Sequence, residues 1–138
     1  MGKTYVWEHK IQYYETDQMQ IAHHSNYIRW FEEARTAAME EAGLGYEKME
    51  AAGVISPVVS VSAKYHKMSR FPETLRIAVE IADYNGVRML LRYRVTEKTS
   101  GELRCTGESE HCYLDESHRL ISLKRSKPEI HAILDAMK

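Results

Sequence analysis

Residues 75–95 read LRIAVEIADYNGVRMLLRYRV, and this stretch decides the fold. Apolar residues occupy alternate positions on both sides of Asn85-Gly86, as expected for two half-buried strands. They are Leu75, Ile77, Val79 and Ile81 before the turn, and Val87, Met89, Leu91, Tyr93 and Val95 after it. An Asn-Gly pair favours a type I′ turn, so the sequence predicts an antiparallel β-hairpin here.

Further strands are expected on both sides of this hairpin. Alternation over residues 5–13 predicts a first strand with Tyr13 on its inward face. Residues 58–68 open with a valine-rich run and predict a second strand, and residues 102–114 follow the turn at Gly101 as the last one. The chain after Pro57 is therefore expected to form an antiparallel meander.

A helical period replaces the alternation in residues 25–43. Apolar side chains recur there at three- and four-residue steps, at Tyr27, Trp30, Phe31, Ala34, Ala38 and Ala42. Ser25 or Asn26 can cap the start of this helix, and Gly43 can end it in a left-handed turn. Shorter helices are expected over residues 46–52 and after Pro128.

The order of strand, long helix and meander predicts an α+β fold in a single domain over residues 1–138. In this fold one antiparallel sheet of about five strands curves around one long central helix. Such a sheet leaves strand edges open, and pairing with a second copy of the chain would cover them.

Composition excludes several classes of protein. Lys and Arg number 19 against 20 Asp and Glu, so no basic excess indicates nucleic-acid binding. No apolar run is long enough to span a bilayer, and the N-terminus lacks the apolar segment of a secretory signal, so a cytoplasmic protein is expected. Cys105 and Cys112 lie on one predicted strand with opposite side-chain directions, roughly 23 Å apart, which excludes a disulfide between them. The absence of a Cys-x-x-Cys pair argues against a zinc site.

Functional side chains are most concentrated in residues 13–27, between the first strand and the long helix. A helix N-terminus offers unpaired N–H groups and a partial positive charge that stabilise a developing oxyanion. Asp17 near that charge stays ionised and can act as base or nucleophile, or it can simply be a turn or capping residue. His23 and His24 can donate hydrogen bonds or move protons. Because these histidines are adjacent, we expect their side chains to diverge and to form no metal site.

The segment Asp17-x-x-x-Ile-Ala-His-His-Ser-Asn-Tyr, followed by a helix with Glu-Glu-Ala-Arg-Thr, resembles the hotdog-fold acyl-CoA thioesterases. The likeness is strongest to the 4-hydroxybenzoyl-CoA thioesterase and YbgC-like branch, and it covers nearly the whole chain. It implies a hotdog fold, hydrolysis of an acyl-CoA thioester to free acid and CoA, and sites between the subunits of a homo-oligomer, either a dimer or a tetramer. The implied chemistry uses a carboxylate and backbone donors, so neither a metal nor another cofactor is expected.

The resemblance also implies roles for particular residues. Asp17 matches the essential carboxylate, which attacks the thioester or activates water. His24 matches the position whose backbone N–H holds the thioester oxygen, and its side chain is also counted as catalytic in the YbgC-like branch. Tyr13 matches an active-site tyrosine. Asn26 is expected to contact substrate, and Arg88 is the candidate cation for the phosphates of CoA.

One position departs from the family pattern. Gln20 stands where the family usually has glycine, and glycine there suits a turn with positive φ. Gln20 is therefore expected to distort or narrow the loop, which affects pocket shape and substrate more than reaction type.

Two other functions fit the same fold. One is a non-catalytic module that binds acyl-CoA and signals to a partner, but such modules usually carry a DNA-binding region, for which 138 residues leave no space. The other is a hotdog dehydratase or hydratase, which needs a histidine and an acid aimed at Cα–Cβ of the acyl group. The spacing from Asp17 to the helix start favours the thioesterase.

Overall fold

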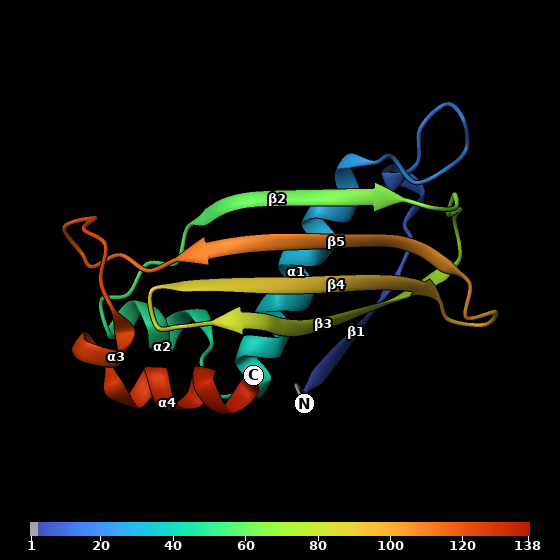
Figure 1. The fold of residues 1–138 in the computed structure, drawn as a ribbon. Coiled ribbons are helices and arrows are strands. Elements are labelled where there is room, and N and C mark those ends of the chain that lie inside the picture. The colour runs from blue at the N-terminus through green and yellow to red at the C-terminus, as the bar shows by residue number, and fades with distance from the viewer. Residues whose placement is uncertain (1–2) are drawn as a thin grey trace.

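The central hairpin predicted from residues 75–95 lies in the middle of one five-stranded sheet (Figure 1). The computed structural model describes residues 3–138. The strands pair antiparallel in the order β1-β3-β4-β5-β2, so β1 and β2 form the two edges. Their bounds are β1 (Thr4–Lys10), β2 (Val58–Tyr65), β3 (Thr74–Tyr84), β4 (Arg88–Glu97) and β5 (Leu103–Cys112).

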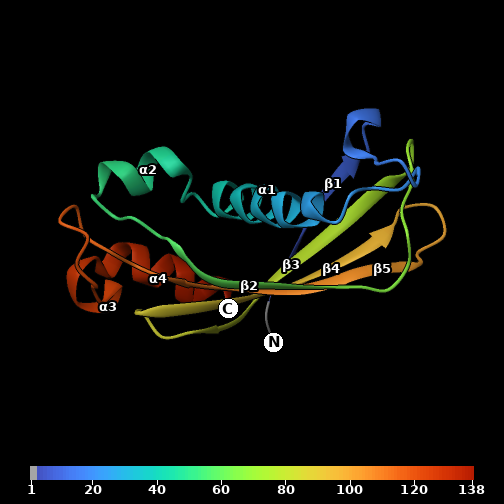
Figure 2. The same cartoon turned by 90° about the horizontal axis from the view of Figure 1, so that it is seen from above.

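One long helix, α1 (Ser25–Glu41), lies across one face of the sheet (Figure 2). The other helices are η1 (Tyr13–Glu15), a short 3₁₀ turn, and α2 (Tyr46–Ala51), α3 (Leu123–Ser126) and α4 (Pro128–Met137). The predicted α+β fold, a sheet of five strands around one long helix, is confirmed. Among the described helices, none has both the length and the apolar character needed to cross a membrane.

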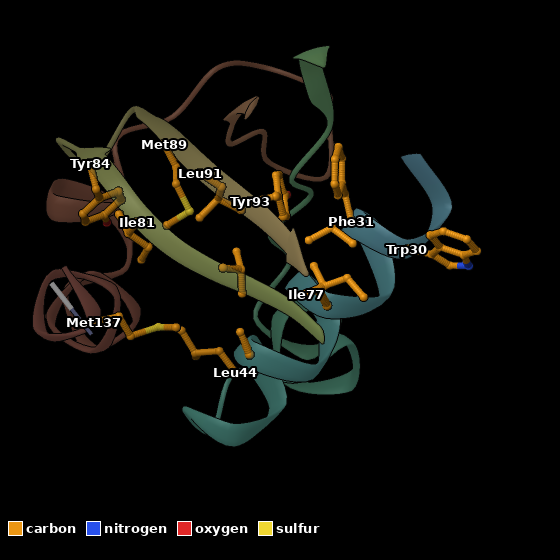
Figure 3. Packing of buried hydrophobic residues seen from close by; sticks show 14 of the residues in the cluster. Trp30, Phe31, Leu44, Ile77, Ile81, Tyr84, Met89, Leu91, Tyr93 and Met137 are labelled. Carbon is orange, nitrogen blue, oxygen red and sulfur yellow. The ribbon is translucent and has the colours of Figure 1, made fainter. Parts of the chain in front are cut away.

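The face of α1 that the sequence predicts as apolar is the face that packs on the sheet. Its buried residues are Asn26, Tyr27, Trp30, Phe31, Ala34 and Ala38. The Phe31 ring stacks on the Tyr93 ring of β4 with centroids 4.3 Å apart and planes 12° from parallel. Both rings point into the layer between helix and sheet (Figure 3).

Gly107 of β5 makes this close approach possible. A Cβ atom at this position would lie 2.4 Å from Cε2 of Phe31 and 2.7 Å from the carbonyl oxygen of Ser62. Both distances are shorter than van der Waals contact, so any side chain there would push the helix or the strand away. The absent side chain therefore sets the height of α1 above the sheet.

The first strand is shorter than predicted. β1 ends at Lys10, and Tyr13 lies in η1 with 78% of its surface exposed, so the prediction that Tyr13 faces inward on a strand is wrong. The chain turns because the backbone N–H of Gln12 donates to a carboxylate oxygen of Glu15 at 2.7 Å. A local side-chain bond to the backbone has replaced continued strand pairing.

The turn at Asn85-Gly86 connects β3 and β4 as predicted, but its type differs. Gly86 has a φ of +90°, whereas Asn85 does not have the positive φ that a type I′ turn requires. The side-chain oxygen of Asn85 instead accepts hydrogen bonds from the N–H groups of Val87 and Arg88, at 2.9 and 2.8 Å. An Asx-type contact therefore closes this hairpin.

Cys105 and Cys112 are both free, as predicted. Cys105 is buried under α1 and Cys112 is only partly buried, which agrees with their positions on opposite faces of β5.

The packing at Gly107 predicts a specific loss of stability. Gly107→Ala adds a methyl group where Phe31 and the Ser62 carbonyl leave no room, so we expect a loss of about 1–3 kcal/mol. Thermal unfolding followed by circular dichroism should show a melting temperature lower by several degrees. Thr106→Ala, on the other face of the same strand, is the matched control and should melt close to the parent. An unchanged melting temperature for Gly107→Ala would mean that α1 does not pack at this height.

Candidate active site

A buried carboxylate, Glu15, joins η1 to the first strand and to α1. Its Oε1 lies 2.8 Å from Nε2 of His9, and its Oε2 accepts the indole N–H of Trp30 at 2.9 Å. Its backbone oxygen accepts the side-chain amide of Asn26 at 2.8 Å and the backbone N–H of His23 at 2.9 Å. Glu15 therefore determines where the residues on either side of the loop can lie.

Glu15 carries its charge in spite of being buried. Burial alone would raise the pKa of its carboxyl, but hydrogen bonds from the Gln12 amide, His9 and Trp30 outweigh burial and hold the pKa below its ordinary value. Glu15 is not among the site residues that the sequence predicts. Gln12 and Glu15 have the three-residue spacing of a capping box, and this spacing is the signal in the sequence that indicates a structural role for Glu15.

The loop after η1 carries Asp17 and returns to α1. Thr16 and Ala22 form a β-bridge at its base, and inside it the N–H of Asp17 donates to the Ile21 carbonyl at 3.0 Å. Oδ1 of Asp17 accepts the backbone N–H of Met19 at 2.9 Å. Asp17 therefore stabilises the turn, which is one of the two roles expected of it. Within residues 3–138 the other carboxylate oxygen, Oδ2, has no hydrogen-bond donor, and it stays available to a ligand.

Gln20 adopts the backbone conformation expected of glycine at this position. Its φ is +65°, which costs a residue with a Cβ atom of order 1 kcal/mol or more. The loop thus keeps the turn that the family pattern implies, and Gln20 carries the strain.

His24 stands immediately before α1 as its N-cap residue. Its carbonyl accepts the hydroxyl of Tyr65, at the end of β2, at 3.0 Å. Its own backbone N–H has no acceptor in the part of the chain that the structure describes. This free donor lies at the positive end of a 17-residue helix, which is the arrangement that stabilises an oxyanion.

The rings of His23 and His24 lie close together, with centroids 4.2 Å apart and planes tilted by 30°. The prediction that these adjacent side chains diverge is therefore wrong. Nδ1 of His23 lies 3.2 Å from the N–H of Ser25 and accepts its hydrogen bond, so His23 takes part in the capping expected of Ser25 or Asn26. No cluster of three or more His, Cys, Asp or Glu with metal-binding geometry occurs among residues 3–138.

The other expected site residues lie at different distances from this loop. Tyr13 is exposed beside it and contacts Phe71 edge-on, with ring centroids 5.9 Å apart. Asn26 lies in the first turn of α1, but its amide nitrogen is used within the chain by Glu15. Arg88 begins β4, at the end of the sheet remote from Asp17, and forms an ion pair with Glu110. In one copy Tyr13, Asp17, His24 and Asn26 all lie on the connection from η1 to the first turn of α1, and Arg88 lies apart from them.

Comparison with known proteins agrees with this architecture. Residues 11–134 match the thioesterase-like superfamily, and the chain belongs to this family. Over 132 residues, covering 95% of both chains, it is 36% identical to a Bacillus subtilis protein described as "Putative acyl-CoA thioesterase YneP". It is 24% identical over 89 residues to the acyl-CoA thioester hydrolase YbgC of Escherichia coli, covering 64% of this chain and 66% of that protein.

A solved structure of a DHNA-CoA thioesterase from Staphylococcus aureus is 32% identical and superposes with a TM-score of 0.90. The match covers 96% of this chain and 89% of that one. These findings confirm the predicted resemblance to hotdog-fold thioesterases of the YbgC-like kind, and they identify the chain as a thioester hydrolase.

The contacts of Glu15 predict how stability depends on pH. Its pKa is lower in the folded than in the unfolded protein, so its contribution is fully present above the unfolded value, about 4.3, and is lost as pH falls through the folded value. Urea unfolding at a series of pH values should show stability falling below about pH 5 in the parent. Glu15→Gln should be less stable at pH 7 and should lose less on acidification. An equally steep acid loss in Glu15→Gln would assign the effect to other carboxylates.

Proposed function

We propose that this thioester hydrolase cleaves acyl-CoA, with Asp17 supplying the attacking group and the backbone N–H of His24 holding the thioester oxygen. The observation that carries the proposal is the free N–H of His24 at the start of α1, on the same loop-to-helix connection as a carboxylate with an unengaged oxygen. The acyl-CoA names of the relatives support the choice of substrate class.

Two routes lead to the same products. In the first, Asp17 removes a proton from water, the water oxygen bonds to the thioester carbon, and the C–S bond then breaks while the CoA sulfur takes up a proton. In the second, the Asp17 carboxylate itself attacks, CoA leaves, and water hydrolyses the resulting anhydride. In both routes negative charge develops on the carbonyl oxygen, where the His24 N–H and the helix dipole stabilise it.

A second copy of the chain is proposed to complete the site. Edge strand β2 is unpaired on one side and exposes four large apolar residues, Val58, Val59, Val61 and Tyr65. Long apolar edges of this kind are usually covered in stable proteins. Tyr65 joins this edge directly to His24, so a partner on β2 would also wall the site.

The same pairing gives Arg88 a place near CoA. If two β2 strands pair antiparallel, the Val58 end of one copy lies beside the Tyr65 end of the other. The end of the sheet that carries Arg88 would then approach the loop of the partner. We therefore propose that Arg88 contacts the CoA phosphates bound at the neighbouring copy's loop, and that Asn26 and Tyr13 contact substrate within their own copy.

The oligomer proposal predicts that the chain is at least a dimer in solution. Light scattering at micromolar concentration should give twice the chain mass or a multiple of it. Val61→Lys places a charge on the β2 edge and should shift the population toward monomer, whereas Thr106→Lys on β5 should not. A fully active monomer would contradict the shared site.

The catalytic proposal predicts the effect of Asp17→Asn. This change keeps the size and the acceptor for Met19 but removes the charge, so we expect kcat to fall at least about 100-fold. The melting temperature should stay within a few degrees of the parent, because a loop carboxylate near a helix start contributes at most about 1 kcal/mol. Release of free thiol from a panel of acyl-CoAs measures the activity.

Two further variants sharpen this test. Asp83→Asn is the matched control, because Asp83 also accepts a backbone N–H but lies at the far end of β3, and it should keep full activity. His24→Ala should lose less activity than Asp17→Asn, since it keeps the backbone N–H. A fully active Asp17→Asn enzyme would move the chemistry to another group, and binding of acyl-CoA without thiol release would make the protein a binding module.

A further inference from the structure

Arg35 is a largely buried cation in the middle of α1, and its one ion pair, with Glu32, is long. Only 17% of its side chain is exposed. Its nearest carboxylate, Glu32, is exposed and lies 3.7 Å away, too far for a hydrogen bond. Its hydrogen bond goes instead to Nδ1 of His111 at 2.8 Å. Buried charges are normally paired, so this arrangement is unusual for a purely structural arginine.

The partner His111 does not neutralise the charge. Burial, reinforced by the charge of Arg35, lowers the pKa of His111 to about 4, so the imidazole is neutral. A guanidinium only donates, which makes Nδ1 the acceptor and leaves the proton on Nε2. Nε2 then donates to the Ser109 hydroxyl at 2.7 Å, and this hydroxyl lies 2.6 Å from that of Tyr93. The polar chain runs from Tyr93 through Ser109 and His111 to Arg35, and it ends in a positive charge whose ion pair with Glu32 is long, at 3.7 Å.

Arg35 and His111 stand where two cavities meet. A small one of about 140 Å³ lies between α1 and β2 and is lined by Ile28, Phe31, Val58 and Val61 besides the polar chain. A larger one of about 390 Å³ continues toward α2, with Met49, Val54 and Met89 in its walls and the carboxylates of Glu32 and Glu50 also in its lining. Of the five N–H donors of Arg35, only one has an acceptor among the described residues. The remaining donors are available to a ligand in these cavities.

The small cavity begins one helical turn after His24, because Ile28 is among the residues that line it. Ile28, Glu32 and Arg35 follow His24 at steps of four, four and three residues, so they form one row along α1. Eleven residues of helix separate His24 from Arg35, or about 16 Å. The side chain of Arg35 shortens this span, because helix side chains lean toward the N-terminus. An extended acyl chain of medium length covers such a span.

We propose that this wedge between α1 and β2 is an acyl subsite whose far end binds a carboxylate through Arg35. The inference rests on the proposed function, and it names the substrate class: CoA thioesters of medium-chain acyl groups that carry a terminal carboxylate. The apolar walls at Ile28, Val58 and Val61 contact the methylene chain, and Arg35 pairs with the anion. His111 orients the guanidinium by holding one of its donors, so it is a positioning residue.

The test compares substrates of equal chain length. The mono-CoA thioester of octanedioic acid and octanoyl-CoA differ only at the far end, and so do the decanedioic and decanoyl pair. We expect the parent to favour the carboxylate-ended member of at least one pair by about 10-fold or more in kcat/KM, because hydrogen bonds between two charged groups are stronger than those between neutral groups. Arg35→Gln should abolish this ratio, Arg35→Lys should retain part of it, and Arg92→Gln on the outer face of the sheet should leave it unchanged.

A second measurement does not depend on the stability of any variant. Calorimetric binding of octanoate and of the uncharged octanamide to the parent protein should show tighter binding of octanoate, because only octanoate carries a carboxylate that Arg35 can bind. Equal kcat/KM for both ends together with equal binding would overturn the subsite and leave acyl-CoA hydrolysis intact. Failure to hydrolyse every thioester would instead overturn the proposed function. If Arg35→Gln weakens the dimer without changing the ratio, the anion of Arg35 belongs to a second copy and the subsite is wrong.

Discussion

Phe31 rests on Tyr93 at a point where Gly107 has no side chain, and the rest of the structure depends on that contact. It lets α1 lie close enough to the sheet for Trp30, the preceding residue, to reach Glu15 on the other side of the helix. Glu15 in turn holds the backbone of His23 and the side chain of Asn26. The position of the N-terminus of α1 therefore depends on how Phe31, in the second turn of this helix, packs on the sheet.

Glu15, which is buried, and Arg35, which is largely buried, differ in how completely their charges are satisfied. Glu15 receives hydrogen bonds from three neighbours and stays ionised inside the fold, as a fully satisfied carboxylate does. Arg35 has one neutral acceptor and one distant carboxylate. The first arrangement builds the loop that carries Asp17, and the second leaves a positive charge at the end of a cavity. A buried ionic group thus supports the scaffold in one place and is available for recognition in the other.

Much of the candidate site was predictable because its residues are neighbours in the chain. Asp17, His23 and His24 lie within eight residues, and the helical period that starts at Ser25 places them at a helix N-terminus. Tyr13 was misplaced because alternation continues past Lys10 in the sequence, whereas the Gln12–Glu15 contact ends the strand. The local hydrogen bond between Gln12 and Glu15, and not the alternation of apolar residues, determines the structure at Tyr13.

By itself the sequence determined the hairpin, the long helix and the order of elements, because alternation and the helical period are properties of neighbouring residues. It did not determine the left-handed backbone of Gln20, because a residue with a Cβ atom disfavours that conformation and the expectation of a turn with positive φ came from the resemblance. Only the tertiary structure decided that Arg35 meets His111, 76 residues away, and that Arg88 lies apart from Asp17 in one copy. These relations depend on strand register and on the height of α1 above the sheet, which are set by packing between segments distant in the chain.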